Sequence, residues 1–276
     1  MRNNQERFGS FQSNPNPAVS QPSFSFVTPT EMVDLPSAGK YYPQGHPLFD
    51  KSSVEIREMT AKEEDILVNK SFIDKGIVLD KLLASVLVDK SIDPQSLLTI
   101  DKNAILLATR ISGYGASYPV RMQCADCDSE SEALVDLNDL LKIKQPVSKE
   151  DIEYLPSGLV SIVLPSTKWV VQLKPLNGYD QERLEKTIEN RRKNKLEENI
   201  LVETLVTFIH SINGVEDYGT ISGAVVNMPA KDSKYLRTLY PECFPSISTL
   251  ATVKCEICSS EVEMEVPFTL NFFWPK

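Results

Sequence analysis

Alternation of apolar and polar residues is the clearest pattern in the chain, and it predicts β-strands with one buried face. Four alternating runs form two pairs, and a short connection joins the runs of each pair. The paired runs are 118–123 with 131–137, and 250–254 with 261–267. We therefore expect two β-hairpins that lie far apart in the sequence.

Helical patterning covers most of the residues before the first hairpin. The expected elements are a strand over 53–59, a helix from about 61 to 67, a helix over about 76–88, a short helical turn at 94, and a helix from 101 to 112. Thr60 and Glu63 have the spacing of a capping box, which satisfies free N–H groups at a helix start. Asp101 is expected to cap the last of these helices, which should end before Gly113.

The residues between the two hairpins are patterned as well. The expected elements are a β-hairpin over 158–173, a helical stretch from 180 to about 212 with a break near 194, and a helix from 229 to 239. Asp180 is expected to cap the long stretch. The second half of that stretch should bury one apolar face, formed by Ile200, Leu201, Leu205, Phe208 and Ile209.

These patterns predict an α+β fold in which a helical domain is joined to β-hairpins. With 276 residues, of which 41% are hydrophobic, the chain can bury a substantial core. It contains no run of 18 apolar residues, so no transmembrane span is expected. The expected divisions are a tail (1–26), a strand-plus-helices region (27–116), the first hairpin (117–145), an α+β insert (146–247), and the second hairpin with the C-terminus (248–276).

The first 26 residues are rich in Asn, Gln, Ser and Pro and show no hydrophobic periodicity. Such a composition is typical of disordered segments. Phe24 and Phe26 could serve as short docking anchors for a partner. Phe8 and Phe11 fit better as aromatic residues scattered along a tail.

Each predicted hairpin carries a Cys-x-x-Cys pair at its tip, Cys124 with Cys127 and Cys255 with Cys258. A pair at this spacing can aim two thiolates at one ion, and structural zinc takes four ligands in a tetrahedron. Together the two pairs supply all four, which leaves no open position for water or a substrate. We therefore expect a split zinc ribbon with one structural zinc ion bound by these four cysteines.

Other uses of paired cysteines fit the sequence less well. A disulfide needs an oxidising compartment, and the N-terminus shows no apolar segment of a signal peptide. A redox Cys-x-x-Cys opens a helix after a strand, whereas both pairs here lie between strands. A zinc deaminase needs His-x-Glu, but His46 and His210 have other neighbours, which also argues against a zinc hydrolase. Cys243 is left over and is expected to be an inert, buried thiol.

The charge pattern argues against nucleic-acid binding. The chain has a net charge of −9, and acidic residues flank its densest basic cluster, 191–195. Pairs such as Glu182 with Lys186 and Glu189 with Lys193 have the spacing of ion pairs on a solvated helix face. A phosphate-binding protein normally shows an unpaired basic patch.

The sequence contains no Gly-rich nucleotide loop, nucleophile elbow or His-Glu-x-x-His motif. Asp101 and Asp232 both lie where a helix is expected to begin, and their carboxylates are expected to cap free N–H groups. We therefore expect a protein without enzymatic activity and without a small-molecule substrate.

The order of several short segments is more specific than any one motif. Leu35-Pro-Ser-x-Gly-x-Tyr-Tyr-Pro is followed by Val54-x-Ile-Arg-x-Met-Thr-x-Lys-Glu-Glu, by Arg110-Ile-Ser-x-Tyr-Gly, by the Cys124 hairpin, and at the end by Phe272-Phe-Trp-Pro. This order resembles the baseplate hub assembly proteins of T-even-type contractile-tailed bacteriophages. The resemblance covers residues 33–142, the last 25 residues more loosely, and the middle insert only in outline.

The resemblance implies a non-enzymatic protein that acts in assembly of the central baseplate hub, with other phage baseplate hub proteins as partners. It implies a location in the host cytoplasm during assembly, and in the virion baseplate if the protein stays there. A hub component and a helper that leaves before the virion matures both fit. The alternative function is a zinc-ribbon nucleic-acid-binding adaptor in phage transcription or replication.

The segment 35–43 is the best candidate for a protein-binding surface, because it is aromatic, Pro-rich and directly follows the tail. A second interpretation is that Tyr41 and Tyr42 pack onto this protein's own zinc hairpins. The sequence leaves both open.

Overall fold

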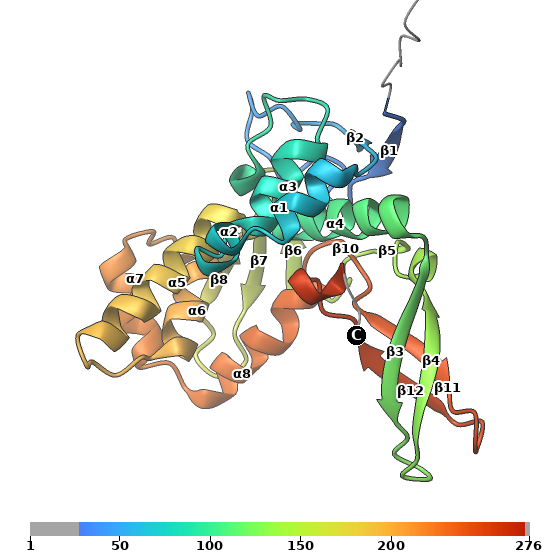
Figure 1. The fold of residues 1–276 in the computed structure, drawn as a ribbon. Helices are drawn as coiled ribbons and strands as arrows, with labels where there is room; N and C mark the ends of the chain where they lie inside the picture. The colour runs from blue at the N-terminus through green and yellow to red at the C-terminus, as the bar shows by residue number, and fades with distance from the viewer. Residues whose placement is uncertain (1–27, 274–276) are drawn as a thin grey trace, which may run out of the picture.

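A long helix, α4 (Thr99–Tyr114), crosses the middle of the molecule and connects its three parts (Figure 1). In Figure 1 most of the N-terminal strands and helices lie above α4, the insert lies below it to the left, and the two long hairpins project below it to the right. This computed structural model describes residues 28–273. The expected disordered tail and its four phenylalanines, Phe8, Phe11, Phe24 and Phe26, lie outside the described residues.

The N-terminal part consists of one small sheet and short helices packed on α4. Strands β1 and β2 pair antiparallel, with Val33 opposite Val54. The bounds are Thr30–Asp34 for β1, Ser53–Arg57 for β2, Ala61–Leu67 for α1, Lys70–Asp74 for α2, Val78–Val86 for α3, and Pro94–Ser96 for a turn of 3-10 helix. The expected capping box is present at the start of α1, where Glu63 accepts the N–H of Thr60 at 2.9 Å.

The insert is an antiparallel four-stranded sheet with the order β6-β7-β8-β9, accompanied by helices. Its strands are Ile152–Tyr154 (β6), Val160–Val163 (β7), Val170–Leu173 (β8) and Ile209–Ile212 (β9). Its helices are Gly178–Lys193 (α5), Ile200–Phe208 (α6), Tyr218–Val226 (α7) and Ala230–Leu239 (α8). The predicted hairpin over 158–173 is confirmed as β7 and β8, with Val163 opposite Val170.

Two hairpins that are far apart in sequence form the projecting part, which we call the arm (residues 117–136 and 250–265). Its strands are Ser117–Gln123 (β3), Glu130–Asp136 (β4), Leu250–Lys254 (β11) and Glu261–Glu265 (β12). Each hairpin is a separate two-stranded sheet, and no strand of one pairs with a strand of the other. Near the base of the arm, two short strands pair antiparallel over two residues each. They are β5 (Ile143–Lys144), which follows the first hairpin, and β10 (Ser246–Ile247), which precedes the second.

Two hydrophobic cores hold the described residues together. One lies inside the insert, where side chains of β7 and β8 meet those of α6 and α8. The other joins the N-terminal helices to the arm, because Leu83 and Ile105 belong to the same cluster as Met122 and Val253. The arm is therefore packed on the N-terminal part although half of it follows the insert in sequence.

The structure corrects the long helical stretch expected after Asp180. Helix α5 begins one turn earlier, with Asn177 as its N-cap and Asp180 as the capping-box partner at the third helical position. The expected break near Asn194 is present, since Asn194 is the C-cap of α5. Residues 209–212 are a strand rather than the end of a helix, because β8 offers them a hydrogen-bonding edge.

Three further expectations differ in detail. Leu205, Phe208 and Ile209 are buried as expected, but Ile200 and Leu201 are 50% and 45% exposed, because α6 begins only at Ile200. Helix α7 was not expected. The helix after Leu98 continues through Gly113 to Tyr114 instead of ending before Gly113.

Three further segments form short 3-10 helices, one after β4, one after α8 and one near the C-terminus. Their bounds are Leu137–Asp139, Tyr240–Glu242 and Leu270–Phe272.

In residues 28–273, none of the helices has the length and apolar character needed to cross a membrane.

Candidate metal centre

The two Cys-x-x-Cys loops at the tip of the arm have the same backbone structure. In the first, the N–H of Cys124 donates to the carbonyl of Ser129 at 2.9 Å, and the N–H of Asp128 donates to the carbonyl of Cys124 at 2.8 Å. In the second, Cys255 pairs with Ser260 at 2.8 Å and Ser259 with Cys255 at 2.9 Å. The residue after each second cysteine is left-handed, with φ of 55° at Asp128 and 63° at Ser259. Two different tetrapeptides therefore form equivalent knuckles.

The structure brings all four predicted cysteines together. Their Sγ atoms all lie within 4.8 Å of one another. Two of the contacts cross between the hairpins, at 3.5 Å from Cys124 to Cys258 and 3.7 Å from Cys127 to Cys255. A zinc ion with Zn–S distances of about 2.3 Å holds its thiolates about 3.8 Å apart, so this donor set fits a tetrahedral zinc site. All four are free cysteines in the structure.

Hydrogen-bond donors in the knuckles stabilise thiolates. The backbone N–H groups of Cys258 and Ile257, together with the Ser129 hydroxyl, lower the pKa of Cys255 to about 6. The hydroxyl and the N–H of Ser260 lower the pKa of Cys258. Thiolates this close repel one another, and a bound dication removes that repulsion because each thiolate then faces a positive charge.

The pKa of Cys124 moves in the opposite direction. Backbone N–H groups of Cys127 and Asp126 lower it, but burial and the neighbouring thiols of Cys258 and Cys127 outweigh them and raise it to about 11. Cys124 and Cys255 are buried between the hairpins, whereas Cys127 and Cys258 are exposed at the tip. Each knuckle thus contributes one inner and one outer thiol.

Two serines near the thiols were missed by the sequence reasoning. The hydroxyl of Ser129 lies 2.9 Å from Cys127 Sγ and 3.7 Å from Cys255 Sγ, and the hydroxyl of Ser260 lies 3.2 Å from Cys258 Sγ. The signal was present in the sequence, because a serine stands two residues after the second cysteine of both pairs.

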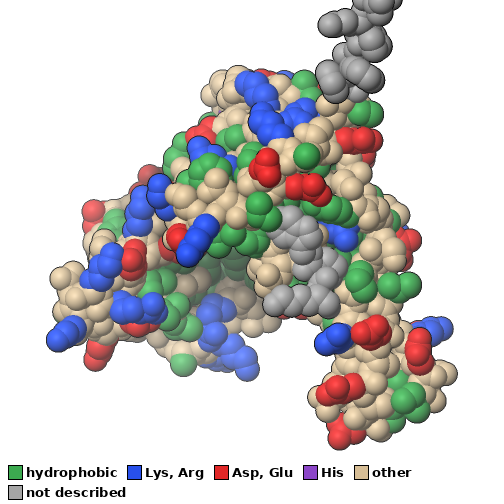
Figure 2. Space-filling model, in the orientation of Figure 1, with side chains coloured by type: hydrophobic (Ala, Val, Ile, Leu, Met, Phe, Trp, Pro, Cys, Tyr) green, Lys and Arg blue, Asp and Glu red, His purple; other side chains and the backbone are tan. Residues whose placement is uncertain are grey.

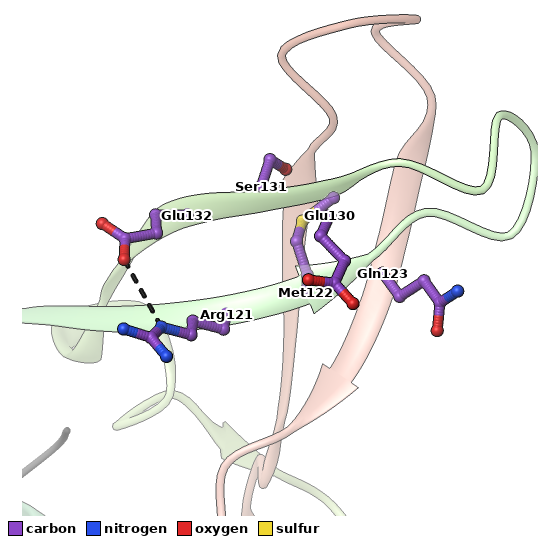
Figure 3. A pocket seen from close by; sticks show the side chains of 6 residues that line it. All are labelled: Arg121, Met122, Gln123, Glu130, Ser131 and Glu132. Atoms are coloured by element: carbon purple, nitrogen blue, oxygen red, sulfur yellow. Dashed lines mark ion pairs between the residues drawn. The ribbon is translucent and has the colours of Figure 1, made fainter.

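Apolar and polar residues alternate along the strands, so each hairpin has one face that it can bury against the other hairpin. In the first hairpin Tyr118, Met122 and Val135 are buried, while Arg121 and Glu132 on the opposite face are exposed and form an ion pair at 3.4 Å. Figure 3 shows that ion pair beside the shallow pocket that six residues of β3 and β4 line. In the second hairpin Ala251 and Val253 are buried.

A buried arginine on α4 fixes the base of the arm, and sequence reasoning gave it no role of its own. Arg110 donates through Nε to the carbonyl of Phe272 at 3.3 Å and through Nη1 to the carbonyl of Gly115 at 3.0 Å. Its guanidinium also lies over the rings of Tyr114 and Tyr118, 5.0 Å and 5.9 Å from their centroids. Beside the shared hydrophobic core, one cation therefore contacts both the entry to β3 and the C-terminal segment.

The remaining cysteine and the histidines lie outside this cluster. Cys243 is buried in the insert core, as expected, and burial raises the pKa of its thiol to about 12. His46 stacks on Tyr42 with the ring centroids 4.3 Å apart, and its Nε2 lies 2.9 Å from the Ser96 hydroxyl. His210 is on β9, with Nε2 3.5 Å from Glu216.

Asp101 and Asp232 do not cap their own helices, which corrects the expectation for both. The N-cap of α4 is Leu98, and Asp101 is buried in the first turn, where it accepts hydrogen bonds from Ser37 and Tyr42. Asp232 lies in the first turn of α8 and accepts the N–H groups of Ser166 and Thr167 at 2.8 and 2.9 Å. Both carboxylates anchor a distant loop, which sequence spacing could not reveal.

The tyrosines of the segment 35–43 contact α4 and the insert rather than the two arm hairpins, which corrects the second interpretation, while docking of a partner on this segment stays a prediction. Tyr42 is buried and donates to Asp101 at 2.8 Å, and Tyr41 packs edge-on against Phe244 of the insert. Neither side chain is positioned on the arm. Gly39 has φ of +72°, and a Cβ there would lie 2.3 Å from the N atom of Lys51, so the loop needs glycine at this position.

The basic cluster on α5 is paired with acids, as the spacing predicted. Lys186 contacts Glu182 and Lys193 contacts Glu189, both at 2.6 Å. Arg192 contacts Glu198 at 2.9 Å. The cluster is therefore a helix face with neutralised charge.

The comparison with curated proteins and the comparison with solved structures returned no match. The comparison with family models returned one, described as T4 bacteriophage base plate protein, over residues 28–274. That match spans the described fold, including all four cysteines, Arg110 and the segment 35–43. The chain therefore belongs to the T4 bacteriophage base plate protein family.

Proposed function

We propose that this baseplate protein is a non-enzymatic hub assembly protein, either a component of the central hub or a helper in its assembly, and that a structural zinc ion holds its arm. Family membership supports a structural role in the phage baseplate. The hub assignment is supported by the resemblance of the ordered segments between residues 33 and 142. The zinc assignment is supported by the convergence of four thiols from two hairpins.

The four-thiol donor set favours a structural ion. With four protein ligands a tetrahedral zinc ion has no open position, so it can neither activate water nor polarise a substrate. Its contribution is to hold two hairpins together, because each hairpin supplies two of the ligands. The buried carboxylates described above are hydrogen-bonded to loops of the same chain, which further supports a protein without catalytic groups.

Zinc is tested by elemental analysis of protein purified without chelator. We expect one zinc ion per chain, and in cobalt-substituted protein a spectrum of tetrahedral thiolate coordination. Protein that is folded, chelator-free and metal-free contradicts the zinc proposal and leaves the hub proposal standing.

The hub role is tested in infected cells. Affinity purification of the tagged chain, followed by mass spectrometry, should enrich central hub proteins over proteins of the outer baseplate. Mass spectrometry of purified virions then separates the two forms of the proposal, since a component is present in virions and a helper is not. Equal recovery of outer and central proteins contradicts the hub assignment but not the family.

A further inference from the structure

Most of the net negative charge of the chain lies on the arm, because few basic residues balance its acids. Residues 117–136 and 250–265 contain nine acidic residues and two basic ones, a net charge of −7, whereas the whole chain has −9. All nine acidic residues are exposed, and Figure 2 shows several of them on the projecting part at lower right. A zinc ion with four thiolates adds about two further negative charges, because the dication neutralises only half of them.

Within the described residues, few basic side chains of the arm form ion pairs with these acids. Its ion pairs are Arg121 with Glu132 at 3.4 Å and Lys254 with Glu261 at 4.0 Å, both between exposed side chains. Glu261, Glu263 and Glu265 alternate along β12 on its outer face. Successive residues on one face of a strand lie about 7 Å apart, which is within the screening length of about 8 Å at physiological salt, so they repel.

The arm also exposes large apolar side chains beside these acids. Leu134 is 70% exposed and Leu250 is 50% exposed, and both line one groove of about 570 Å³ between β4 and β11. Acids lie beside them, since Glu132 and Asp136 flank Leu134 on the same strand face and Glu265 lies opposite Leu250. Two lysines also line the groove, Lys142, which pairs with Asp139 at 2.8 Å, and Lys144. Exposed apolar side chains with a polar rim are typical of protein-binding surfaces.

We propose that the outer surface of the arm, centred on the Leu134–Leu250 groove, docks onto a lysine- and arginine-rich surface of another baseplate protein. Charge complementarity selects this class of partner, because the phosphates of nucleic acids and of anionic lipids carry the same sign as the arm. An apolar side chain of the partner fills the groove, and its basic residues meet the acidic rim. This inference rests on the proposed baseplate function and adds the location and chemistry of the contact.

The test measures binding of the full-length chain to each purified baseplate protein of the same phage by biolayer interferometry. We expect at least one partner whose affinity falls at least tenfold between 50 and 300 mM salt. The triple variant Glu261→Gln, Glu263→Gln, Glu265→Gln should weaken that binding at least tenfold and flatten its salt dependence. The double variant Leu134→Ser, Leu250→Ser should weaken it as much and leave the salt dependence unchanged.

Matched controls separate the arm from general effects of charge and exposure. Glu182→Gln, Glu185→Gln, Glu189→Gln makes the same change in charge on α5, and Leu196→Ser, Leu201→Ser removes leucines that are 58% and 45% exposed in the insert. Both controls should bind as wild type. The arm variants should melt at or above the wild-type temperature, because the acids repel one another and the leucines are exposed.

Three results overturn the proposal, and they differ in what else they affect. If the arm variants bind as tightly as wild type, the contact lies elsewhere and the baseplate function is unaffected. If the α5 control weakens binding as much as the arm variant, net charge rather than the arm is responsible. If wild type binds no baseplate protein, both this inference and the proposed function fail.

Discussion

The arm and the insert are both antiparallel β-structures, but they bury their strands in different ways. In the insert, the inner residues of β7 and β8 are almost fully buried under helices. In the arm, β12 contributes only half-buried Val262 and Met264, and the two hairpins share no backbone ladder. An isolated two-stranded hairpin is marginally stable in water. The comparison teaches that a projecting element with so little core needs another source of stability, which the proposed zinc ion supplies by linking the two hairpins.

The two parts also differ in how their loops are held. In the insert, the carboxylate of Asp232 holds the turn between β7 and β8 through backbone N–H groups of Ser166 and Thr167. In the arm, four free thiols converge at the tips, and Arg110 contacts carbonyls at the base. The following predictions test this contrast, from the largest expected effect to the smallest.

Removal of the metal, or the change Cys124→Ser, should unfold the arm while the insert stays folded. Metal binding energy is coupled to the folding of the ligating loops, and four close thiolates without a cation repel. Hydrogen exchange should show loss of protection over 117–136 and 250–265, with 160–173 still protected. Equal loss of protection in both parts would show that the arm and the insert are one cooperative unit.

The control for this prediction is Cys243→Ala in the insert. Cys243 is fully buried among apolar side chains, so a serine there introduces an unpartnered hydroxyl, and alanine is the cleaner test. We expect a loss of about 1 kcal/mol from the smaller side chain and full zinc content. Loss of zinc from this variant contradicts the separation of Cys243 from the metal centre.

Loss of the Arg110 guanidinium should loosen the whole arm without emptying the zinc site. Arg110→Met keeps the aliphatic stem but removes hydrogen bonds to the carbonyls of Phe272 and Gly115, which we expect to cost about 2–3 kcal/mol of unfolding free energy. Urea denaturation measures the loss. Arg121→Met, which removes an exposed ion pair of the arm, should change stability by less than about 0.5 kcal/mol.

The carboxylate of Asp232 should make the insert sensitive to acid. Burial alone raises its pKa, but hydrogen bonds from Thr167 and Ser166 outweigh burial and place the pKa below its usual value. The unfolded chain therefore binds the proton first, so the carboxylate stabilises the insert above about pH 4, and this contribution is lost as the pH falls through the folded-state pKa.

The measurement compares Asp232→Asn with wild type at pH 7 and pH 3, with hydrogen exchange of insert amides as the readout. We expect the variant to be less stable by about 1–2 kcal/mol at pH 7, with a smaller difference at pH 3. Asp139→Asn, at an exposed ion pair with Lys142, serves as the control. A constant difference across this pH range contradicts the role given to the charge.

Glycine at the left-handed position of a knuckle should stabilise the arm slightly. Ser259 has φ of 63°, which costs a non-glycine residue about 1 kcal/mol, so Ser259→Gly should raise stability by about 0.5 kcal/mol. Asp128→Gly should gain less, because it loses the contact between Asp128 and the Gln123 amide. Resistance of bound zinc to a chelator measures both. Asp126→Gly, in the same loop, should reduce resistance.

Local patterns were sufficient to predict several elements and contacts. Alternation and cysteine spacing located both hairpins and the four thiols that converge. The spacing of Thr60 and Glu63 predicted the start of α1, and spacing on α5 predicted the ion pairs of Lys186 and Lys193. The hairpins, the helix start and the ion pairs each depend on residues within a few positions of one another. The convergence of the cysteines was predicted because two Cys-x-x-Cys pairs together supply the four ligands of a tetrahedral zinc site.

Other features depended on partners distant in sequence. Residues 209–212, Ile-His-Ser-Ile, are compatible with helix or strand by their local pattern, and the free edge of β8 decides for strand. Asp101 and Asp232 have the spacing of helix caps but bind loops 64 and 66 residues away.

The sequence by itself determined the local elements and the residue types of the proposed metal centre, because backbone periodicity and thiol chemistry are local properties. Only the tertiary structure decided that both hairpins share a core with the N-terminal helices, and that Arg110 contacts the chain at their base. It also decided that Leu35 and Tyr42 of the 35–43 segment are buried while the acids and leucines of the arm remain exposed. The physical reason is that burial and pairing depend on which distant residues are neighbours, and one-dimensional spacing does not contain that information.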